Sequence, residues 1–66
     1  MKVLVNGEPA DLNEGETVHG VVLALGRGPR GIAVAVNGEV VPRSQWEARI
    51  LSDDDRVEVL TAAQGG

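Results

Sequence analysis

The sequence predicts a single α+β domain of two layers, in which one helix covers one face of a mixed β-sheet. Two Asn-Gly dipeptides each separate a pair of short apolar runs, as in β-hairpins, and one stretch between them repeats apolar residues at helical spacing. The 66 residues leave room for one domain. Trp46 is the only aromatic residue, so we expect an aliphatic core.

A first hairpin is predicted at the start of the chain. Residues 2–5 form a short apolar run that ends at Asn6-Gly7, a dipeptide that tolerates the positive φ angles of a tight turn, and residues 8–12 return antiparallel. Pro9 has no N–H for the sheet ladder. The returning strand should therefore lie at an edge of the sheet.

A helix is predicted over residues 18–25, with Thr17 as its N-cap and Gly26 as its stop. Valines and leucines recur along it at helical spacing and form one apolar stripe. Gly20 interrupts the helix at a cost of about 1 kcal/mol relative to alanine. Either a close approach of helix to sheet or a later helix start would explain this glycine.

A second hairpin and a final strand are predicted in the other half of the chain. Residues 32–36 alternate large side chains with alanine, as expected of an interior strand whose large side chains face the helix. Residues 39–41 return after the second Asn-Gly turn. Ser44 and Glu47 fit a capping box at the start of a short helical turn carrying Trp46. After a polar turn at residues 52–55, residues 56–60 form the last strand.

The resulting order is ββαβββ, and it divides the chain into a folded domain of residues 1–60 and a tail of residues 61–66. If the first and last strands pair, they must be parallel neighbours at the centre of the sheet. The tail carries no charge and no large apolar side chain, so we expect it to be mobile.

Composition excludes several classes of function. A net charge of −4 argues against nucleic acid as a partner, because phosphate contacts supply most of that affinity. There is no cysteine, and therefore no disulfide, thiolate metal site or nucleophilic thiol. No long apolar run is present, so we expect neither a signal peptide nor a membrane partner and place the protein in the cytoplasm.

No residue pattern predicts catalysis or a bound metal. Gly26, Gly28 and Gly31 spell G-x-G-x-x-G, but the motif follows the helix and precedes a strand, the reverse of a dinucleotide site, so it is interpreted as a loop. His19 has no second ligand nearby. Asp53–Asp55 lack calcium-loop spacing and are interpreted as a solvated turn, and Ser44 lacks a nucleophile-elbow context.

The chain ends in Gly65-Gly66, and the Gly66 carboxylate is a group that can be chemically activated. A carboxylate is a poor electrophile, and ATP-dependent adenylation converts it into a mixed anhydride that sulfur or nitrogen can attack. Residues without Cβ atoms can thread a narrow channel and adopt backbone angles closed to other residues. The sequence therefore predicts a carrier whose Gly66 carboxylate is activated by a partner enzyme, with Ala63, Gln64 and Gly65 entering that partner's active site.

Read as a whole, the chain resembles the ThiS family of sulfur carriers, small β-grasp proteins similar in fold to ubiquitin. The resemblance covers essentially all 66 residues and is carried by residues 31–46, with Val-Pro-Arg-Ser-x-Trp, and by residues 55–66, with Ala-Gln-Gly-Gly. It implies that the last strand lies between the first and the third.

The resemblance also implies a function in thiamine biosynthesis. An E1-like enzyme would adenylate Gly66 with ATP, sulfur relayed from cysteine by a desulfurase would replace the AMP, and the thiocarboxylate would supply thiazole synthase. The chain itself would be no enzyme, would bind no cofactor and would be a monomer when free.

Alternatives remain open at this point. The same terminus could send sulfur to molybdopterin or to tRNA bases, or could modify proteins as ubiquitin does. Because Lys2 is the only lysine, polymeric chains through several internal lysines are excluded, but a single conjugation event is not. A pure binding module would tolerate extra residues after Gly66. We also predict a partner surface that includes Val40, Val41 and Trp46, since exposed apolar patches mark interfaces; structural packing of Trp46 is an equal alternative.

Overall fold

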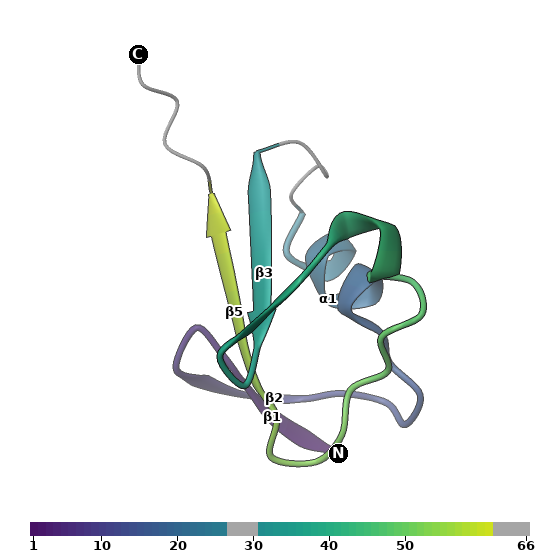
Figure 1. Ribbon diagram of the computed structural model, residues 1–66. Helices are drawn as coiled ribbons and strands as arrows, with labels where there is room; N and C mark the ends of the chain where they lie inside the picture. The colour runs from purple at the N-terminus through teal and green to yellow at the C-terminus, as the bar shows by residue number, and fades with distance from the viewer. Residues whose placement is uncertain (27–30, 62–66) are drawn as a thin grey trace.

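The computed structural model describes residues 1–26 and 31–61. These residues form five strands, one α-helix and one 3-10 helix around a shared core (Figure 1). In chain order the elements are β1 (Lys2–Val5), β2 (Glu8–Asp11), α1 (Val18–Ala24), β3 (Ile32–Val36), β4 (Glu39–Val41), η1 (Arg43–Gln45) and β5 (Arg56–Thr61). The predicted element order is confirmed, with most boundaries within one residue.

Both Asn-Gly dipeptides form the predicted hairpin turns. Asn6 and Gly7 have φ angles of 51° and 84°, and Asn37 and Gly38 have 53° and 84°. Positive φ at both central residues gives a twist that matches the right-handed twist of the flanking strands. The turns therefore set the antiparallel registers of β1 with β2 and of β3 with β4.

The sheet has the order β2-β1-β5-β3-β4, so β5 is its central strand. β5 pairs in parallel with β1, where Leu4 lies opposite Arg56, and antiparallel with β3, where Ala33 lies opposite Leu60. β2, with Pro9, is an edge strand. Both the predicted pairing of the first and last strands and the edge position of the second strand are confirmed.

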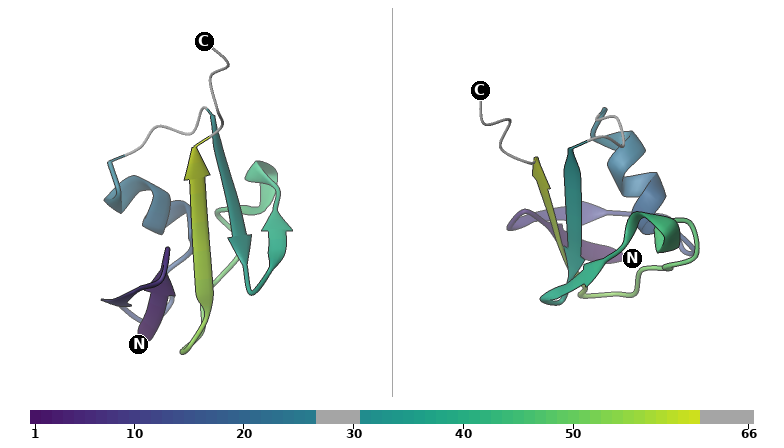
Figure 2. Two further views of the ribbon diagram at one scale, coloured as in Figure 1. Left: turned by 90° about the vertical axis from the view of Figure 1, so that its left-hand side faces the viewer. Right: turned by 45° about the horizontal axis from the view of Figure 1, so that its top comes forward.

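Helix α1 lies across one face of the sheet (Figures 1 and 2). The Thr17 hydroxyl oxygen accepts a hydrogen bond of 3.2 Å from the Gly20 N–H, as predicted for the N-cap. The helix ends at Ala24, Leu25 is its C-cap, and Gly26 follows with a φ of 73°. The G-x-G-x-x-G motif thus begins just after a helix and ends just before β3, as a connecting loop does, while its residues 27–30 lie outside the described residues.

The core is aliphatic apart from one tryptophan. The alternation predicted for β3 is confirmed, since Val34 and Val36 are buried and Ile32 packs against the same cluster. Trp46 is 2% exposed, and its indole N–H donates a 2.9 Å hydrogen bond to the Val41 carbonyl oxygen. The buried cluster consists of Val18, Val21, Val22, Val34, Val36, Val41, Trp46, Leu51, Val57 and Val59.

Two local predictions are wrong. The capping box at Ser44 does not form, because the 3-10 helix begins at Arg43 with Pro42 as its N-cap and has no side-chain cap. The fixed φ of proline, −59° here, already suits the residue before a helical turn. The turn at residues 52–55 is not fully solvated either, since Asp55 is 8% exposed and accepts hydrogen bonds from the Ser52 N–H and the Asn37 side-chain amide.

Thr61, the first residue of the predicted tail, belongs to β5 and lies opposite Ile32 in the sheet. Residues 62–66, the rest of the predicted tail, lie outside the described residues, so the division into domain and tail stays a prediction.

Candidate functional site

The candidate site is the C-terminal end of β5, because this strand leads directly to the predicted carrier terminus. β5 is held on both sides, by β1 and by β3, over its first residues. Its end at Thr61 points to one end of the molecule, opposite the chain's N-terminus (Figures 1 and 2). Gly66 and the threading residues Ala63, Gln64 and Gly65 lie outside the described residues, so their predicted roles stay predictions.

The side chain of Asn6 holds β5 beyond the last backbone pair with β1. Its amide oxygen accepts a hydrogen bond of 2.8 Å from the Val59 N–H, and its amide nitrogen donates one of 3.2 Å to the Val59 carbonyl oxygen. These two bonds take the place of a further strand residue, since the chain turns at Asn6-Gly7. Asn6 thus fixes the strand two residues before Thr61.

The sheet face opposite α1, here called the outer face, is apolar near the end of β5. It carries the β3 alanines and residues of the two neighbouring strands. Val40 is 75% exposed and Leu60 62% exposed, although both are large and apolar. Around the second half of β5, the residues of the outer face are Ala33, Ala35, Val40, Glu58 and Leu60.

The partner surface predicted at Val40, Val41 and Trp46 is wrong for two of its three members. Val41 is 7% exposed and Trp46 is 2% exposed, and both belong to the core. Successive residues of a strand point to opposite faces, so Val40 and Val41 could not share one surface. The structural alternative for Trp46 holds, and Val40 alone remains on the surface.

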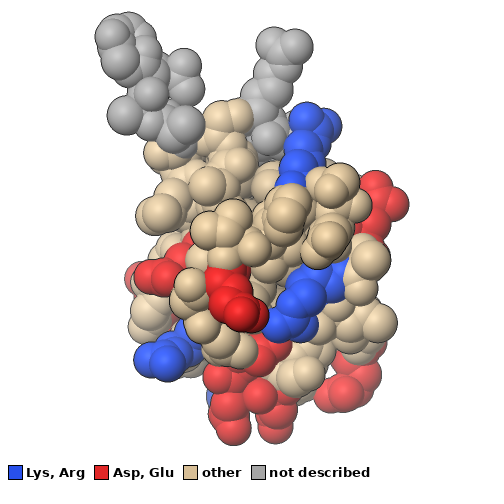
Figure 3. Space-filling model, viewed as in Figure 1, with Lys and Arg blue, Asp and Glu red and all other residues tan. Residues whose placement is uncertain are grey.

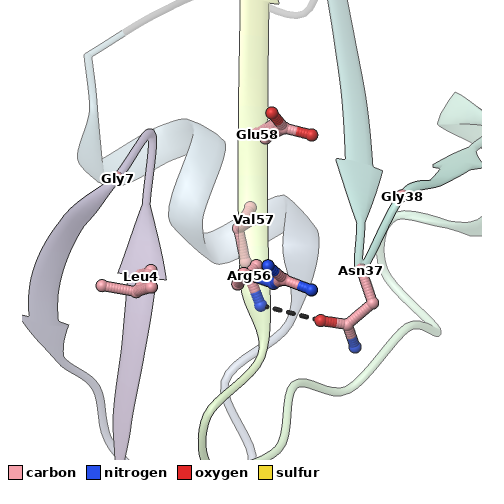
Figure 4. Close-up of a pocket in the computed structure, with 7 residues that line it drawn as sticks. All are labelled: Leu4, Gly7, Asn37, Gly38, Arg56, Val57 and Glu58. Carbon is pink, nitrogen blue, oxygen red and sulfur yellow. Dashed lines mark hydrogen bonds between the residues drawn. The ribbon is translucent and has the colours of Figure 1, made fainter.

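A depression of about 360 Å³ lies over the first half of β5, away from the strand's C-terminal end (Figure 4). The polar side chains that line it are Arg56 and Glu58, both on β5, and Asn37. The Asn37 amide oxygen already accepts a 2.9 Å hydrogen bond from the Arg56 N–H (Figure 4). No nucleophile with an adjacent base is among the lining residues, which are Leu4, Gly7, Asn37, Gly38, Arg56, Val57 and Glu58.

The charged side chains are unevenly distributed. Figure 3 shows uncharged surface at the upper left of the view, toward the end of β5, a basic side chain at the upper right, and most of the acidic side chains in the lower part. Within residues 1–26 and 31–61, no three His, Cys, Asp or Glu side chains are grouped so that they could hold a metal ion. In the same described ranges, no helix has the length and apolar character needed to cross a membrane.

The sequence interpretation missed Leu60 and Asn6. Leu60 was detectable, because the alternation of the last strand places it on the face opposite Val57 and Val59, both buried. Asn6 was identified only as a turn residue. Its contact with Val59 follows from the sheet order and has no local signal in the sequence.

Comparisons with known proteins agree with this geometry. A thiamine biosynthesis protein (ThiS) from Geobacter metallireducens, known from a crystal structure, superimposes with a TM-score of 0.84 at 33% identity, with both chains covered completely. The sulfur carrier protein ThiS of Escherichia coli K12 is 33% identical over 66 residues, again the whole of both chains. A thiazole synthase of Magnetococcus marinus is 39% identical over 66 residues, but the chain spans only 20% of that protein's length.

A mixed five-stranded sheet with β5 at its centre and one helix on one face defines the β-grasp class of ubiquitin-like proteins. The family model named ThiS matches residues 3–66. The chain belongs to the ThiS family. The predicted family, the predicted fold and the predicted function as a sulfur carrier for thiamine biosynthesis are thereby confirmed.

Proposed function

We propose that this chain carries sulfur as a thiocarboxylate on Gly66 and delivers it for synthesis of the thiazole part of thiamine. The observation that supports this most is the continuity of the family match to Gly66, in a chain whose central strand leads into that terminus. The folded domain is then the part that partner enzymes bind, and the terminus carries the reacting atoms. The chain is a substrate of its partners and no enzyme.

The chemistry requires a partner that uses ATP. An oxygen of the Gly66 carboxylate attacks the α-phosphate of ATP, and pyrophosphate leaves. The outer sulfur of a persulfide, formed from cysteine by a desulfurase relay, then attacks the carbonyl carbon, and AMP leaves. A second thiol of the relay must reduce the resulting acyl disulfide, which releases the thiocarboxylate and leaves a disulfide on the relay. The chain has no cysteine, so the sulfur must come from another protein. An E1-like adenylating enzyme is the proposed partner for the first step.

Thiazole synthase is the proposed acceptor of the sulfur. The Magnetococcus marinus protein of that name contains a region similar to the whole of this chain, which supports a physical association of the two functions. A β-grasp body that presents its terminus to a separate synthase would perform the same task in two chains. Transfer leaves the Gly66 carboxylate free for another cycle.

The outer face is the proposed docking surface for these partners. Val40 and Leu60 expose large apolar side chains on it, with the small Ala33 and Ala35 between them. These residues belong to β3, β4 and β5, and β5 is the strand that leads to the terminus. The contact would hold the body while the tail enters the active site.

Blocking the terminus tests the proposal. Adding one alanine after Gly66 moves the carboxylate away from the α-phosphate and puts a Cβ next to it, while the described fold is untouched. We expect loss of ATP–pyrophosphate exchange with the adenylating enzyme and an unchanged circular dichroism spectrum. Exchange that continues with the extended chain would refute a function at Gly66.

A further inference from the structure

The turn between β3 and β4 has the sequence of a deamidation site, Asn37-Gly38. In this reaction the glycine nitrogen attacks the side-chain carbonyl carbon of the asparagine, and the amide nitrogen leaves as ammonia with the glycine N–H proton. Water then opens the resulting succinimide ring at one of its two carbonyls and gives aspartate or isoaspartate. Glycine has no Cβ that hinders the attack. The turn Asn6-Gly7 has the same sequence, so only the structure can distinguish the two sites.

Asn37 is bound to the beginning of β5 through three of its groups. Its backbone N–H donates a 2.8 Å hydrogen bond to the Arg56 carbonyl oxygen, and its amide oxygen accepts one of 2.9 Å from the Arg56 N–H (Figure 4). Its amide nitrogen donates one of 2.9 Å to an Asp55 carboxylate oxygen. A backbone N–H only donates and a carboxylate only accepts, so one orientation of the amide satisfies both partners. Loss of the amide nitrogen necessarily breaks the bond to Asp55.

The new charge would lie against a carboxylate that is already buried. Asp55 is 8% exposed, and its second carboxylate oxygen accepts a 2.8 Å hydrogen bond from the Ser52 N–H. Its carbonyl oxygen accepts one of 2.9 Å from the Leu4 N–H, so Asp55 also connects β1 to the start of β5. An aspartate at position 37 would replace the donor by a second acceptor. Two carboxylates this close repel each other strongly where water is partly excluded.

The turn at Asn6 lacks this arrangement. The Asn6 amide binds the backbone N–H and carbonyl oxygen of Val59, neither of which carries a net charge. A carboxylate at position 6 could still accept the bond from the Val59 N–H. Asn6 and Asn37 have φ angles of 51° and 53°, which aspartate tolerates as asparagine does. The two turns therefore differ in the charge that faces the modified residue and not in their backbone conformation.

We propose that Asn37 is a modification site at which deamidation destabilises the fold. Its bonds to Arg56 and Asp55 restrain the reaction while the chain is folded, and the carboxylate that forms opposes Asp55 once the reaction has occurred. An isoaspartate here also adds one carbon atom to the main chain of a two-residue turn, and so disturbs the pairing of β3 with β4. The inference concerns the folded domain and is independent of the function proposed for Gly66.

The aspartate product is reproduced by Asn37→Asp in the full chain, with Asn6→Asp as the matched control. Asn37→Asp loses a hydrogen bond to a charged group and gains a like-charge contact. Its unfolding equilibrium constant should therefore exceed that of Asn6→Asp by about tenfold or more at neutral pH. Urea unfolding followed by the fluorescence of the buried Trp46 provides both constants.

A double variant tests whether the contact with Asp55 is the cause. Asn37→Asp/Asp55→Asn exchanges the donor and the acceptor between the two positions. The amide introduced at position 55 can accept from the Ser52 N–H and donate to the carboxylate introduced at position 37. The double variant should recover most of the stability that Asn37→Asp loses. If Asn37→Asp does not fold, a folded double variant still supports the inference.

Ageing of the unmodified chain at mildly alkaline pH tests the restraint by the fold. Peptide mass mapping identifies the conversion of the Asn37 amide to an acid. The conversion should be slower by about tenfold or more in buffer than in denaturing urea, because less than about 1% of the molecules of a stable small domain are unfolded in buffer.

Any of three results would overturn the inference. One is Asn37→Asp with the stability of Asn6→Asp. Another is a double variant that is no more stable than Asn37→Asp, since the repulsion by Asp55 would then not be the cause. The third is an equal rate of Asn37 conversion in buffer and in urea, because the contacts with β5 would then not restrain the reaction.

Discussion

Asn6 and Asn37 act as both turn residues and strand partners. Each adopts a positive φ, which asparagine tolerates better than most residues, and each uses its side chain to bind the backbone of β5. Asn37 also donates to the buried Asp55 carboxylate at 2.9 Å. Both hairpin turns are thereby bound to the central strand, one at its first residue, Arg56, and the other at Val59.

Replacing Asn6 measures this contribution. Asn6→Gly keeps the positive φ accessible but removes both bonds to Val59, and we expect a loss of about 1–3 kcal/mol in the free energy of unfolding. Asn6→Ala should lose about 1 kcal/mol more, because alanine is strained at positive φ. Urea unfolding followed by the fluorescence of the buried Trp46 provides the values. Equal stability of Asn6→Gly and the unmodified chain would show that the two hydrogen bonds from Asn6 to Val59 do not stabilise the fold.

At the scale of elements, packing of helix α1 against the sheet does not account for Gly20. Neither explanation offered for Gly20 by the sequence is supported: the helix begins before it, at Val18, and the three atoms nearest to an added Cβ all belong to the Glu16 side chain. A flexible side chain can move away. Gly20 is therefore not required by packing against the sheet.

Gly20→Ala should stabilise the protein. Alanine is favoured over glycine within a helix by about 0.8–1 kcal/mol, and the same gain is expected here once Glu16 adopts another rotamer. Comparing Glu16→Ala with Glu16→Ala/Gly20→Ala measures the effect of the alanine without its contact with the Glu16 side chain. Thermal unfolding should give the double variant the higher midpoint. A lower midpoint would mean that Gly20 has a packing role.

The elements themselves were predictable because local signals agree with the final fold. Asn-Gly turns, alternation in β3 and the Thr17 cap act within a few residues of the structure that they specify. Features that depend on distant neighbours were not predictable in this way. The burial of Trp46 depends on how the segment after β4 packs against the helix and the sheet. The bonds from Asn6 to Val59 join residues 53 positions apart in the sequence.

The candidate site was predictable in part for the same reason. The Gly65-Gly66 terminus could be identified directly as a sequence motif, and its role stays a prediction. The comparisons confirm the family that residues 31–46 and 55–66 resemble. The surface beside it could not be assigned from composition. Val41 was placed there although it follows Val40 in the strand and must point into the core.

For the whole molecule, the parallel pairing of β1 with β5 puts the N-terminal end of the chain and Lys2 at one end of the sheet, and the end of β5 at the other. The outer face is uncovered in the described residues, because their only α-helix lies on the opposite face. The proposed docking surface is therefore next to the end of the strand that leads to Gly66.

Charge substitutions on the outer face test the docking surface. Val40→Asp and Leu60→Asp place a carboxylate on exposed positions, so the free energy of unfolding should change by only about 0.5 kcal/mol. Affinity for the adenylating enzyme, measured by calorimetry, should fall about tenfold or more if these side chains are buried in the complex. Ile50→Asp is the control, because Ile50 is also exposed and apolar but lies outside the sheet strands. Equal affinities for all three variants and the unmodified chain would exclude the outer face.

The central claim, that Gly66 carries the sulfur, is tested most directly by intact mass spectrometry of the chain after incubation with ATP, the adenylating enzyme and a cysteine-fed sulfur source. The account predicts a shift equal to one oxygen replaced by sulfur, located at Gly66 by fragmentation. The account would be contradicted by an unshifted chain together with covalent adducts of its terminus on lysines of other proteins, which is the behaviour of a ubiquitin-like modifier.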